Sequence, residues 1–346
     1  MGANGEPQDP RAASWLEAGA SFEWRPARGT EGSVRIFHAE FGSHDAPVLL
    51  LLHGFPTSSL DWSDVVGRLG ATHRVCTLDF PGYGFSDKPE DWPYSLFLDA
   101  ELVAHYLTTV VGARRCTVLS HDRGDSVALL LHHMARSGEL GVELDELLLT
   151  NGNIFLPLAN LTTFQKLVLD PASAESVLEQ VTPEALAEGM GRTTFSPPRD
   201  ASDPTISTLA ATFSWNSGVK VLHRTIQYLR ERAEHERSWL ESLAGSPVPT
   251  TVLWGALDTV SPPRVAFHVW EHYLRDKPGL NELWLLPGAN HYLQNDRPDA
   301  FVDAVTAAFD RTGTEAPGPL SEDDRSPIRV DQSAGQLRAA GDAFVL

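Results

Sequence analysis

Residues 117–126 read Thr-Val-Leu-Ser-His-Asp-Arg-Gly-Asp-Ser, and this stretch decides the fold. An apolar, β-branched run ends at Ser120, and a helical pattern begins near Asp125. The spacing small-x-Asp-x-Gly between them is typical of a sharp strand-to-helix turn that lifts one side chain above the end of a sheet. Such turns usually carry Ser or Cys at the apex, whereas this one carries Asp122. A simpler interpretation is that Asp122 only caps the helix that follows.

The composition restricts the classes of partner. The chain has 346 residues, 42% of them apolar, which is enough for one large α/β core. Its 27 basic and 46 acidic residues give a net charge of -19, which argues against nucleic acid and anionic membranes as partners. The two cysteines, Cys76 and Cys116, lie in apolar runs, as reduced core residues do. No apolar run reaches the length of a transmembrane helix, so we expect a cytoplasmic protein.

The order of apolar runs predicts a mostly parallel sheet covered by helices. Runs without alternation, as in strands buried on both faces, occur at residues 48–52, 75–79, 147–150, 250–254 and 282–286. Helical patterns separate these runs, for example at about residues 95–111. Between residues 152 and 246 there is no strand-like run, and helical patterns alternate with Pro- and Gly-rich breaks. This segment is predicted to be a helical cap inserted into the sheet domain.

These patterns divide the chain into four parts. The core domain is expected to comprise residues 21–151 and 247–310, and the cap residues 152–246. Residues 1–20 are expected to be a frayed N-terminus. Residues 311–346 are polar and lack periodicity, which predicts a disordered tail.

Polar residues follow later strands of the predicted sheet. Asp258 comes after one strand and His291 after the next. Taken singly, these are typical of a turn residue and a surface histidine. Because loops at the carboxyl ends of parallel strands meet in one crevice, we expect Asp122, Asp258 and His291 to be neighbours, in the order nucleophile, acid, histidine. The main-chain N–H groups of Phe55 and Arg123 are predicted to form an oxyanion hole. The other histidines show no metal-ligand spacing, so neither a metal nor a cofactor is expected.

Several stretches resemble the α/β-hydrolase superfamily, in its epoxide hydrolase and haloalkane dehalogenase branch, and within it the mesoderm-specific transcript family. They are residues 51–62 (LLHGFPTSSLDW), 79–89 (DFPGYGFSDKP), 119–125 (LSHDRGD) and 150–155 (TNGNIF). The resemblance extends from about residue 34 to residue 309, and Asp125 after the turn glycine is a rather specific mark. It implies the α/β-hydrolase fold with an inserted α-helical cap.

The residue types define a two-step hydrolysis of a small molecule with an electrophilic carbon. A carboxylate is ionised at neutral pH, so Asp122 needs no base to attack the carbon and form an ester. His291, oriented by Asp258, would activate the water that hydrolyses this ester. Epoxide hydrolysis is the first expectation, and removal of halide from a haloalkane or haloacid is the alternative. A different class, a catalytically idle fold that acts through a partner, stays open.

The resemblance bears on the leaving group. Epoxide hydrolases of this family use two cap tyrosines, of which Tyr228 matches one and no residue of the first cap helix matches the other. Haloalkane dehalogenases carry tryptophan after the nucleophile, where this chain has Arg123. Fluoroacetate dehalogenases have a second arginine where this chain has Ser126. Tyr228 is the first candidate leaving-group residue. Trp62 is the second, although its pattern is also typical of a structural residue.

Overall fold

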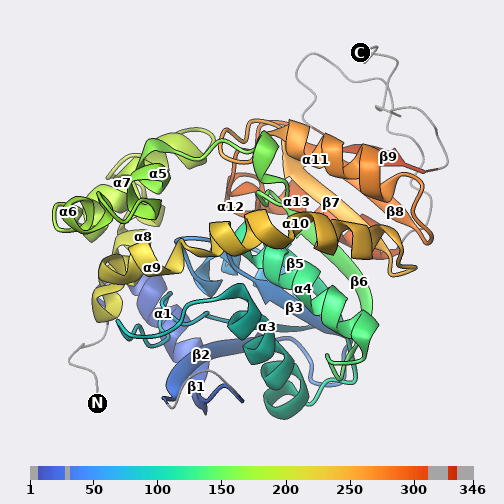
Figure 1. The fold of residues 1–346 in the computed structure, drawn as a ribbon, viewed down its shortest axis with the longest axis horizontal. Coiled ribbons are helices and arrows are strands. Elements are labelled where there is room, and N and C mark those ends of the chain that lie inside the picture. Colours follow the sequence, from blue (N-terminus) through green and yellow to red (C-terminus); the bar gives the residue numbers. More distant parts are fainter. Residues whose placement is uncertain (1–6, 28–31, 311–325, 333–346) are drawn as a thin grey trace.

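The apolar runs form the strands of one sheet in the computed structural model, which describes residues 7–27, 32–310 and 326–332 (Figure 1). The strands are β1 (Gly19–Trp24), β2 (Val34–Phe41), β3 (Val48–Leu52), β4 (Arg74–Leu78), β5 (Arg115–His121), β6 (Glu143–Thr150), β7 (Thr250–Gly255), β8 (Asn281–Leu286) and β9 (Ile328–Asp331). They lie in the order β1-β2-β4-β3-β5-β6-β7-β8-β9. Strands β3 to β8 pair in parallel, whereas the β1–β2, β2–β4 and β8–β9 pairs are antiparallel.

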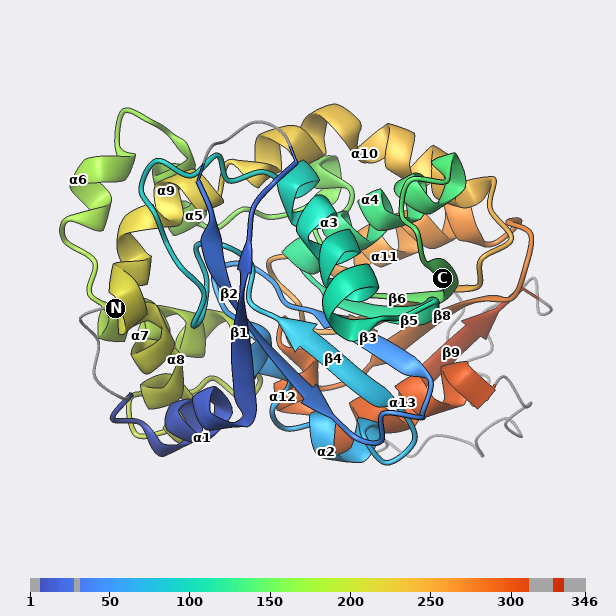
Figure 2. The same ribbon diagram turned by 90° about the horizontal axis from the view of Figure 1, so that it is seen from below.

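The central strands carry buried apolar side chains on both faces because helices cover both faces of the sheet. In β3, Leu50 and Leu52 join one core cluster, and Leu49 and Leu51 join the other. The first cluster packs under α3 (Leu96–His105), α4 (Arg123–Ser137), α10 (Tyr228–Ala244) and α11 (Pro263–Val269). The second packs under α1 (Pro10–Ala18), α2 (Val66–Leu69), α12 (Leu293–Asp296) and α13 (Pro298–Asp310), as Figure 2 shows from below. The predicted fold, a mostly parallel sheet flanked by helices, is confirmed.

A helical segment separates β6 from β7, as the sequence predicts. It contains η3 (Leu156–Leu158), α5 (Thr163–Leu169), α6 (Ala174–Leu178), α7 (Pro183–Thr194), α8 (Pro204–Ser214), η4 (Trp215–Val221), α9 (Leu222–Thr225) and α10. The last of these helices leaves the cap and runs across the face of the sheet domain above α4 (Figure 1). It therefore joins the cap to the core, and its first residues lie above the carboxyl ends of the strands.

Smaller helical pieces complete the described chain. They are η1 (Ser59–Trp62), η2 (Tyr106–Val111) and η5 (Trp270–Leu274). The expected helix from Ser95 to Val111 is present as α3 continued by η2, with the Ser95 hydroxyl capping the Phe97 N–H at 3.1 Å. It ends at Gly112, which has the left-handed φ of 69° that glycine adopts without strain. Within the described residues, no helix has both the length and the apolar composition needed to cross a membrane.

Both expectations for the chain ends need correction. Within residues 1–20, Pro10–Ala18 form helix α1, because Asp9 caps its first turn and Trp15 is buried, donating from Nε1 to Ser59 Oγ at 3.1 Å. Within residues 311–346, Ile328–Asp331 form β9 and pair with β8, which gives their main-chain groups partners that the local sequence does not reveal. Residues 1–6, 311–325 and 333–346 lie outside the described residues.

Candidate active site

Asp122 lies at the turn between β5 and α4, with φ 49° and ψ -106°. A non-glycine residue at positive φ is strained, and such strain is a feature of sharp turns that present a side chain. The neighbours are small because the chain is crowded here. A Cβ atom on Gly124 would come within 2.6 Å of the Leu52 carbonyl oxygen, and one on Gly54 within 2.7 Å of Asp122 Cβ. The sharp turn predicted from small-x-Asp-x-Gly is therefore present.

The Asp122 carboxylate has one occupied and one unoccupied oxygen. Oδ2 accepts a hydrogen bond from the Phe55 main-chain N–H at 2.9 Å. Oδ1 is buried and has no hydrogen-bond partner among the described residues. Arg123 begins α4, so its main-chain N–H is one of the first-turn groups that have no acceptor within a helix. The structure therefore brings together the nucleophile candidate and the two residues of the predicted oxyanion hole.

Asp258 and His291 also meet, from the loops after β7 and β8. His291 Nδ1 lies 2.8 Å from Asp258 Oδ2, and the other carboxylate oxygen accepts the N–H groups of Val260 and Ser261 at 2.7 and 2.9 Å. Burial alone would lower the pKa of His291. The charge and hydrogen bond of Asp258, together with the charge of Asp122, outweigh burial and raise the pKa to about 9. Asp258 therefore fixes the orientation of His291 through a hydrogen bond, and the negative charge of Asp122 helps to raise the pKa of the histidine.

Sequence reasoning missed two side chains that hold this arrangement. Asn151 Nδ2 donates to Asp258 Oδ2 at 2.8 Å, and its Oδ1 accepts the Gly255 N–H at 2.8 Å, which ties the loops after β6 and β7 together. The positive φ of Asn151, 49°, suits the Asn-Gly pair that follows β6, and that pair was the available signal. Asp61, which accepts a hydrogen bond from the Thr57 hydroxyl, is buried close to the site, and burial raises its pKa well above the ordinary range.

The side chain of Arg123 is buried and forms an ion pair with Asp99 of α3. Its guanidinium carbon lies 4.9 Å from the ring centroid of Phe80 and 5.3 Å from that of Tyr228. Nε and Nη1 have no hydrogen-bond partner among the described residues. Burial raises the pKa of Asp99 to about 6, restrained by the arginine, so the pair is ionised at neutral pH.

A second buried arginine, also missed by sequence reasoning, comes from α10. Arg232 donates from Nε to Ser126 Oγ at 2.5 Å and from Nη2 to the Asp122 carbonyl oxygen at 3.2 Å. Its nitrogen Nη1 has no partner within the described chain. The guanidinium thus bridges the cap helix to the turn that carries Asp122.

The two leaving-group candidates lie in different environments. Tyr228, at the start of α10, is buried, and its hydroxyl has no partner among the described residues. Its ring lies 6.1 Å from that of Phe55. Burial, with a contribution from the Asp122 charge, raises the pKa of its phenol well above the usual value. Trp62 is fully buried in the core cluster of α12 and α13, where its ring lies 6.2 Å from that of Phe301. A leaving-group role for Trp62 stays a prediction.

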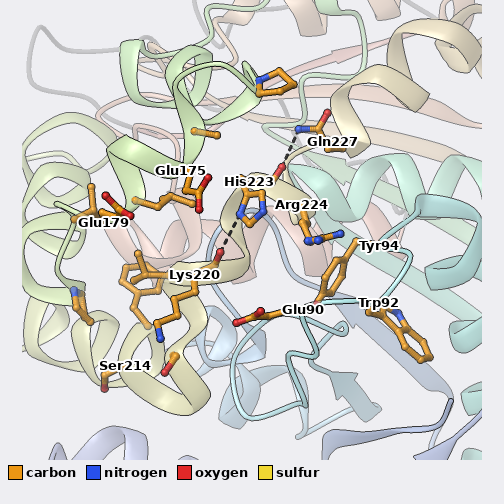
Figure 3. A pocket seen from close by; sticks show the side chains of 18 of the residues that line it. Glu90, Trp92, Tyr94, Glu175, Glu179, Ser214, Lys220, His223, Arg224 and Gln227 are labelled. Carbon is orange, nitrogen blue, oxygen red and sulfur yellow. Dashed lines mark hydrogen bonds between the residues drawn. The ribbon is translucent and has the colours of Figure 1, made fainter.

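A cavity of about 1110 Å³ lies between the cap and the loop that contains Trp92 (Figure 3). Acidic and basic side chains share its wall, among them Glu175, Lys220 and Arg224. The wall includes none of the three residues of the predicted triad. Gln227, the residue before Tyr228, is the lining residue nearest in sequence to the site. The cavity is therefore a feature of the cap beside the triad.

Known proteins resemble this chain in sequence and in fold. The family described as the alpha/beta hydrolase family matches residues 49–304. A putative hydrolase, LipZ, of Mycobacterium tuberculosis is 33% identical over 297 residues, covering 86% of this chain and 97% of the relative. The mesoderm-specific transcript homolog protein of Bos taurus is 32% identical over 303 residues, covering 85% and 87%.

Among solved structures, the haloalkane dehalogenase DbeA from Bradyrhizobium elkani superposes with a TM-score of 0.67. It covers 85% of this chain and 100% of its own, at 20% sequence identity, which establishes a shared fold. These matches agree with the site, in which Asp122 lies at a strained turn and Asp258 and His291 follow later strands. The chain belongs to the alpha/beta hydrolase family.

Proposed function

We propose that the protein hydrolyses a small molecule through a covalent ester on Asp122, with an epoxide as the first candidate substrate. The observation that carries this proposal is the state of the Asp122 carboxylate. One oxygen is held by the Phe55 N–H, and the other, Oδ1, is buried without a partner. An oxygen in that state is available to attack an electrophilic carbon, because no protein hydrogen bond has to be broken first.

In the first step, Oδ1 forms a bond to the carbon while the epoxide C–O bond breaks. The departing alkoxide is a strong base and needs a proton as it forms. The Tyr228 hydroxyl can supply it, since it is buried near Asp122, has no other described partner and is protonated at neutral pH. This availability of an O–H donor is the reason for ranking an epoxide first.

In the second step, water attacks the carbonyl carbon of the Asp122 ester while His291 accepts a proton from the water, and the bond from that carbon to the oxygen that carries the substrate then breaks. The product leaves as an alcohol, which takes the proton back from His291, and the carboxylate is restored. Alkylation removes the negative charge of Asp122, which is one cause of the high His291 pKa. The pKa of the histidine should therefore fall when the ester forms, so that it becomes a usable base at the stage that needs one. The oxyanion would develop on Oδ2, which already accepts from Phe55, with the Arg123 N–H as the second donor.

Dehalogenation is the second candidate. A halide ion leaves without needing a proton, and weak N–H donors suffice to stabilise it. The unpartnered guanidinium nitrogens of Arg123 and Arg232 favour this alternative. A ligand-binding role without turnover would also use this fold, and it differs from both reactions because no bond to Asp122 would form.

Intact-protein mass spectrometry of a His291→Gln variant tests the proposal. After exposure to a panel of epoxides and alkyl halides, this variant should retain a covalent adduct that peptide mapping locates on Asp122. An Asp122→Asn, His291→Gln double variant should show none. His133→Gln, which changes an exposed histidine of α4, is the matched control and should turn over without accumulation. Absence of an adduct with every compound, or an adduct that survives loss of Asp122, would exclude the mechanism.

A further inference from the structure

Arg232 is a buried cation that forms no ion pair with the described residues. Its side chain is fully buried, and its described hydrogen bonds go to a hydroxyl and to a main-chain carbonyl, neither of which carries charge. No carboxylate oxygen of the described residues, including that of Asp122, forms an ion pair with it. Burial of an unpaired charge is costly, so such a group usually marks the place of an ionic partner.

The nearby carboxyl groups do not provide that partner. Asp99 is paired with Arg123, and Asp258 with His291. Asp125 uses Oδ1 to accept hydrogen bonds from the Ser120 hydroxyl and the Thr150 N–H at 2.6 and 3.1 Å and forms no ion pair with Arg232, while burial raises its pKa well above the ordinary range. Glu236, one turn along α10, accepts the Leu156 N–H at 2.8 Å.

The guanidinium has one edge engaged and one edge available. Nε and Nη2 donate side by side to Ser126 and to the Asp122 carbonyl, which uses the side edge of the planar group. The end edge is formed by Nη1 and the second N–H of Nη2, and Nη1 has no partner in the described chain. Two parallel N–H groups on such an edge match the two oxygens of a carboxylate.

The guanidinium group of Arg232 lies close to the turn that carries the reacting carboxylate, since Nη2 donates to the Asp122 main-chain carbonyl at 3.2 Å. The Arg232 guanidinium carbon is 5.0 Å from the Tyr228 ring centroid, and the Arg123 guanidinium carbon is 5.3 Å from the same centroid. Because Asp99 already pairs with Arg123, the charge of Arg232 is the one that would offset the repulsion between an anionic substrate and Asp122. A neutral substrate would leave the Arg232 charge without a partner throughout the reaction.

We propose that the substrate carries a carboxylate, and that Arg232 binds it through its end edge so that a neighbouring electrophilic carbon faces Asp122. The attack on that carbon rests on the proposed function. The binding of the carboxylate does not, and two separate measurements therefore test the two ideas.

The first measurement is binding in an Asp122→Asn variant, which cannot react. Titration calorimetry with acetate and with acetamide compares a carboxylate with a neutral molecule of the same shape. Acetate should bind about 10- to 100-fold more tightly, the usual worth of a charged hydrogen-bonded pair. Adding Arg232→Gln should abolish this preference, whereas Arg230→Gln, an exposed arginine on the same helix, should preserve it.

Arg232 also contacts the turn of Asp122, so the glutamine variant can fail to fold. Arg232→Lys is the second variant, because it keeps the charge and loses the planar edge. It should bind acetate more weakly than the Asp122→Asn parent and still favour it over acetamide. Equal binding of acetate and acetamide by the parent, or a preference that survives Arg232→Gln, would overturn the proposal.

The second measurement follows adduct formation in the His291→Gln variant with glycidate and glycidamide, two epoxides that differ only in the carboxylate. Glycidate should alkylate Asp122 about 10- to 100-fold faster, and Arg232→Gln should remove the difference by slowing glycidate alone. Adducts formed at equal rates would refute carboxylate recognition and leave the reaction intact. Acetate binding that depends on Arg232, without any adduct, would refute the reaction and leave the anion site intact.

Discussion

On the sheet side of the candidate site, the polar atoms of Asp258 have protein partners, whereas on the cap side the Tyr228 hydroxyl and one Arg232 nitrogen have none. Asp258 accepts hydrogen bonds on both oxygens, and these fix the orientation of His291. Burying polar groups without partners is costly, and native proteins do so mainly where a ligand completes the arrangement. The Asp258–His291 pair therefore has its partners in the free protein, whereas the cap side and the Asp122 oxygen Oδ1 have polar atoms without partners among the described residues.

This difference separates chemistry from specificity. The groups that would hydrolyse an ester come from loops of the sheet domain, whose positions are set by the paired parallel strands β7 and β8. The groups that would contact the leaving group and the rest of the substrate come from α10, a helix of the inserted segment. Substitutions on the sheet side should stop the reaction for every substrate. Those on the cap side should change which substrates react.

The largest effect is expected on the sheet side, from Asp258→Asn. Loss of the carboxylate should slow ester hydrolysis by roughly 10²- to 10⁴-fold and leave alkylation nearly unchanged. Hydrolysis requires neutral His291, whose pKa is raised to about 9 in the free protein and should be lower in the ester, so the rate should increase with pH through a midpoint below about 9. Without the charge of Asp258 the pKa falls, and the increase should move to lower pH.

Single-turnover hydrolysis of the isolated ester, from about pH 6 to about pH 10, measures both changes. Asp303→Asn, which changes an exposed carboxylate on α13, is the control. A pH profile that does not move in Asp258→Asn would mean that Asp258 does not act on the base.

A smaller and more selective effect is expected on the cap side, from Tyr228→Phe. The ring and its packing on Phe55 stay, and only the hydroxyl is lost. Alkylation by an epoxide should slow by roughly 10²-fold, the usual worth of a general acid, while alkylation by a halide and hydrolysis of the ester should change little. Tyr94→Phe removes a hydroxyl that donates to the Pro89 carbonyl in the cap cavity, and serves as control.

Rapid-mixing measurements of adduct formation with one epoxide and one halide would separate these outcomes. Equal slowing of both compounds would assign the tyrosine to binding instead of proton transfer. An unchanged epoxide rate would remove the main argument for ranking epoxides above halides.

The sheet side could be predicted from the sequence, because its signals are local. Each buried strand is a continuous apolar run, and the polar residue that follows it must lie at the carboxyl edge of the sheet. The Asp122 turn is a further local signal, because its glycine is needed where a Cβ atom would clash with neighbouring main-chain atoms. Because Asp258 and His291 each follow a later buried strand, both could be predicted to lie at this edge without knowledge of any contact.

The cap side was less predictable, because its contacts depend on how α10 crosses the core. Tyr228, Arg232 and Glu236 are four residues apart and share one buried face of that helix. Their spacing was visible in the sequence, but charged residues usually mark a solvent-exposed face. Only packing on α4 reveals that this polar stripe is buried. Strand β9 was missed for a similar reason, since four residues in a polar segment become a strand only by pairing with β8.

The smallest effect on activity is expected from the C-terminal segment, whose described part is strand β9 at the edge of the sheet, paired with β8. A chain that stops after Asp310 loses β9, including buried Val330 and the pair between Arg329 and Glu282, 2.5 Å apart. Loss of one buried valine and one ion pair should cost about 2 kcal/mol, which lowers the melting temperature by about 3 °C. Turnover per folded molecule should stay within about twofold, since the Asp258–His291 pair does not depend on β9 for its hydrogen bonds.

A chain that stops after Gln332 keeps β9 and is the matched control for this truncation. Its melting temperature, measured by calorimetry, and its turnover of one accepted substrate should both equal those of the full chain. If the two truncated chains melt together, β9 does not contribute to the stability of the sheet. If the shorter chain also loses turnover, the edge of the sheet must influence the loop of His291 through β8. The comparison between the Asp258–His291 pair and the cap side would then have to include this third region.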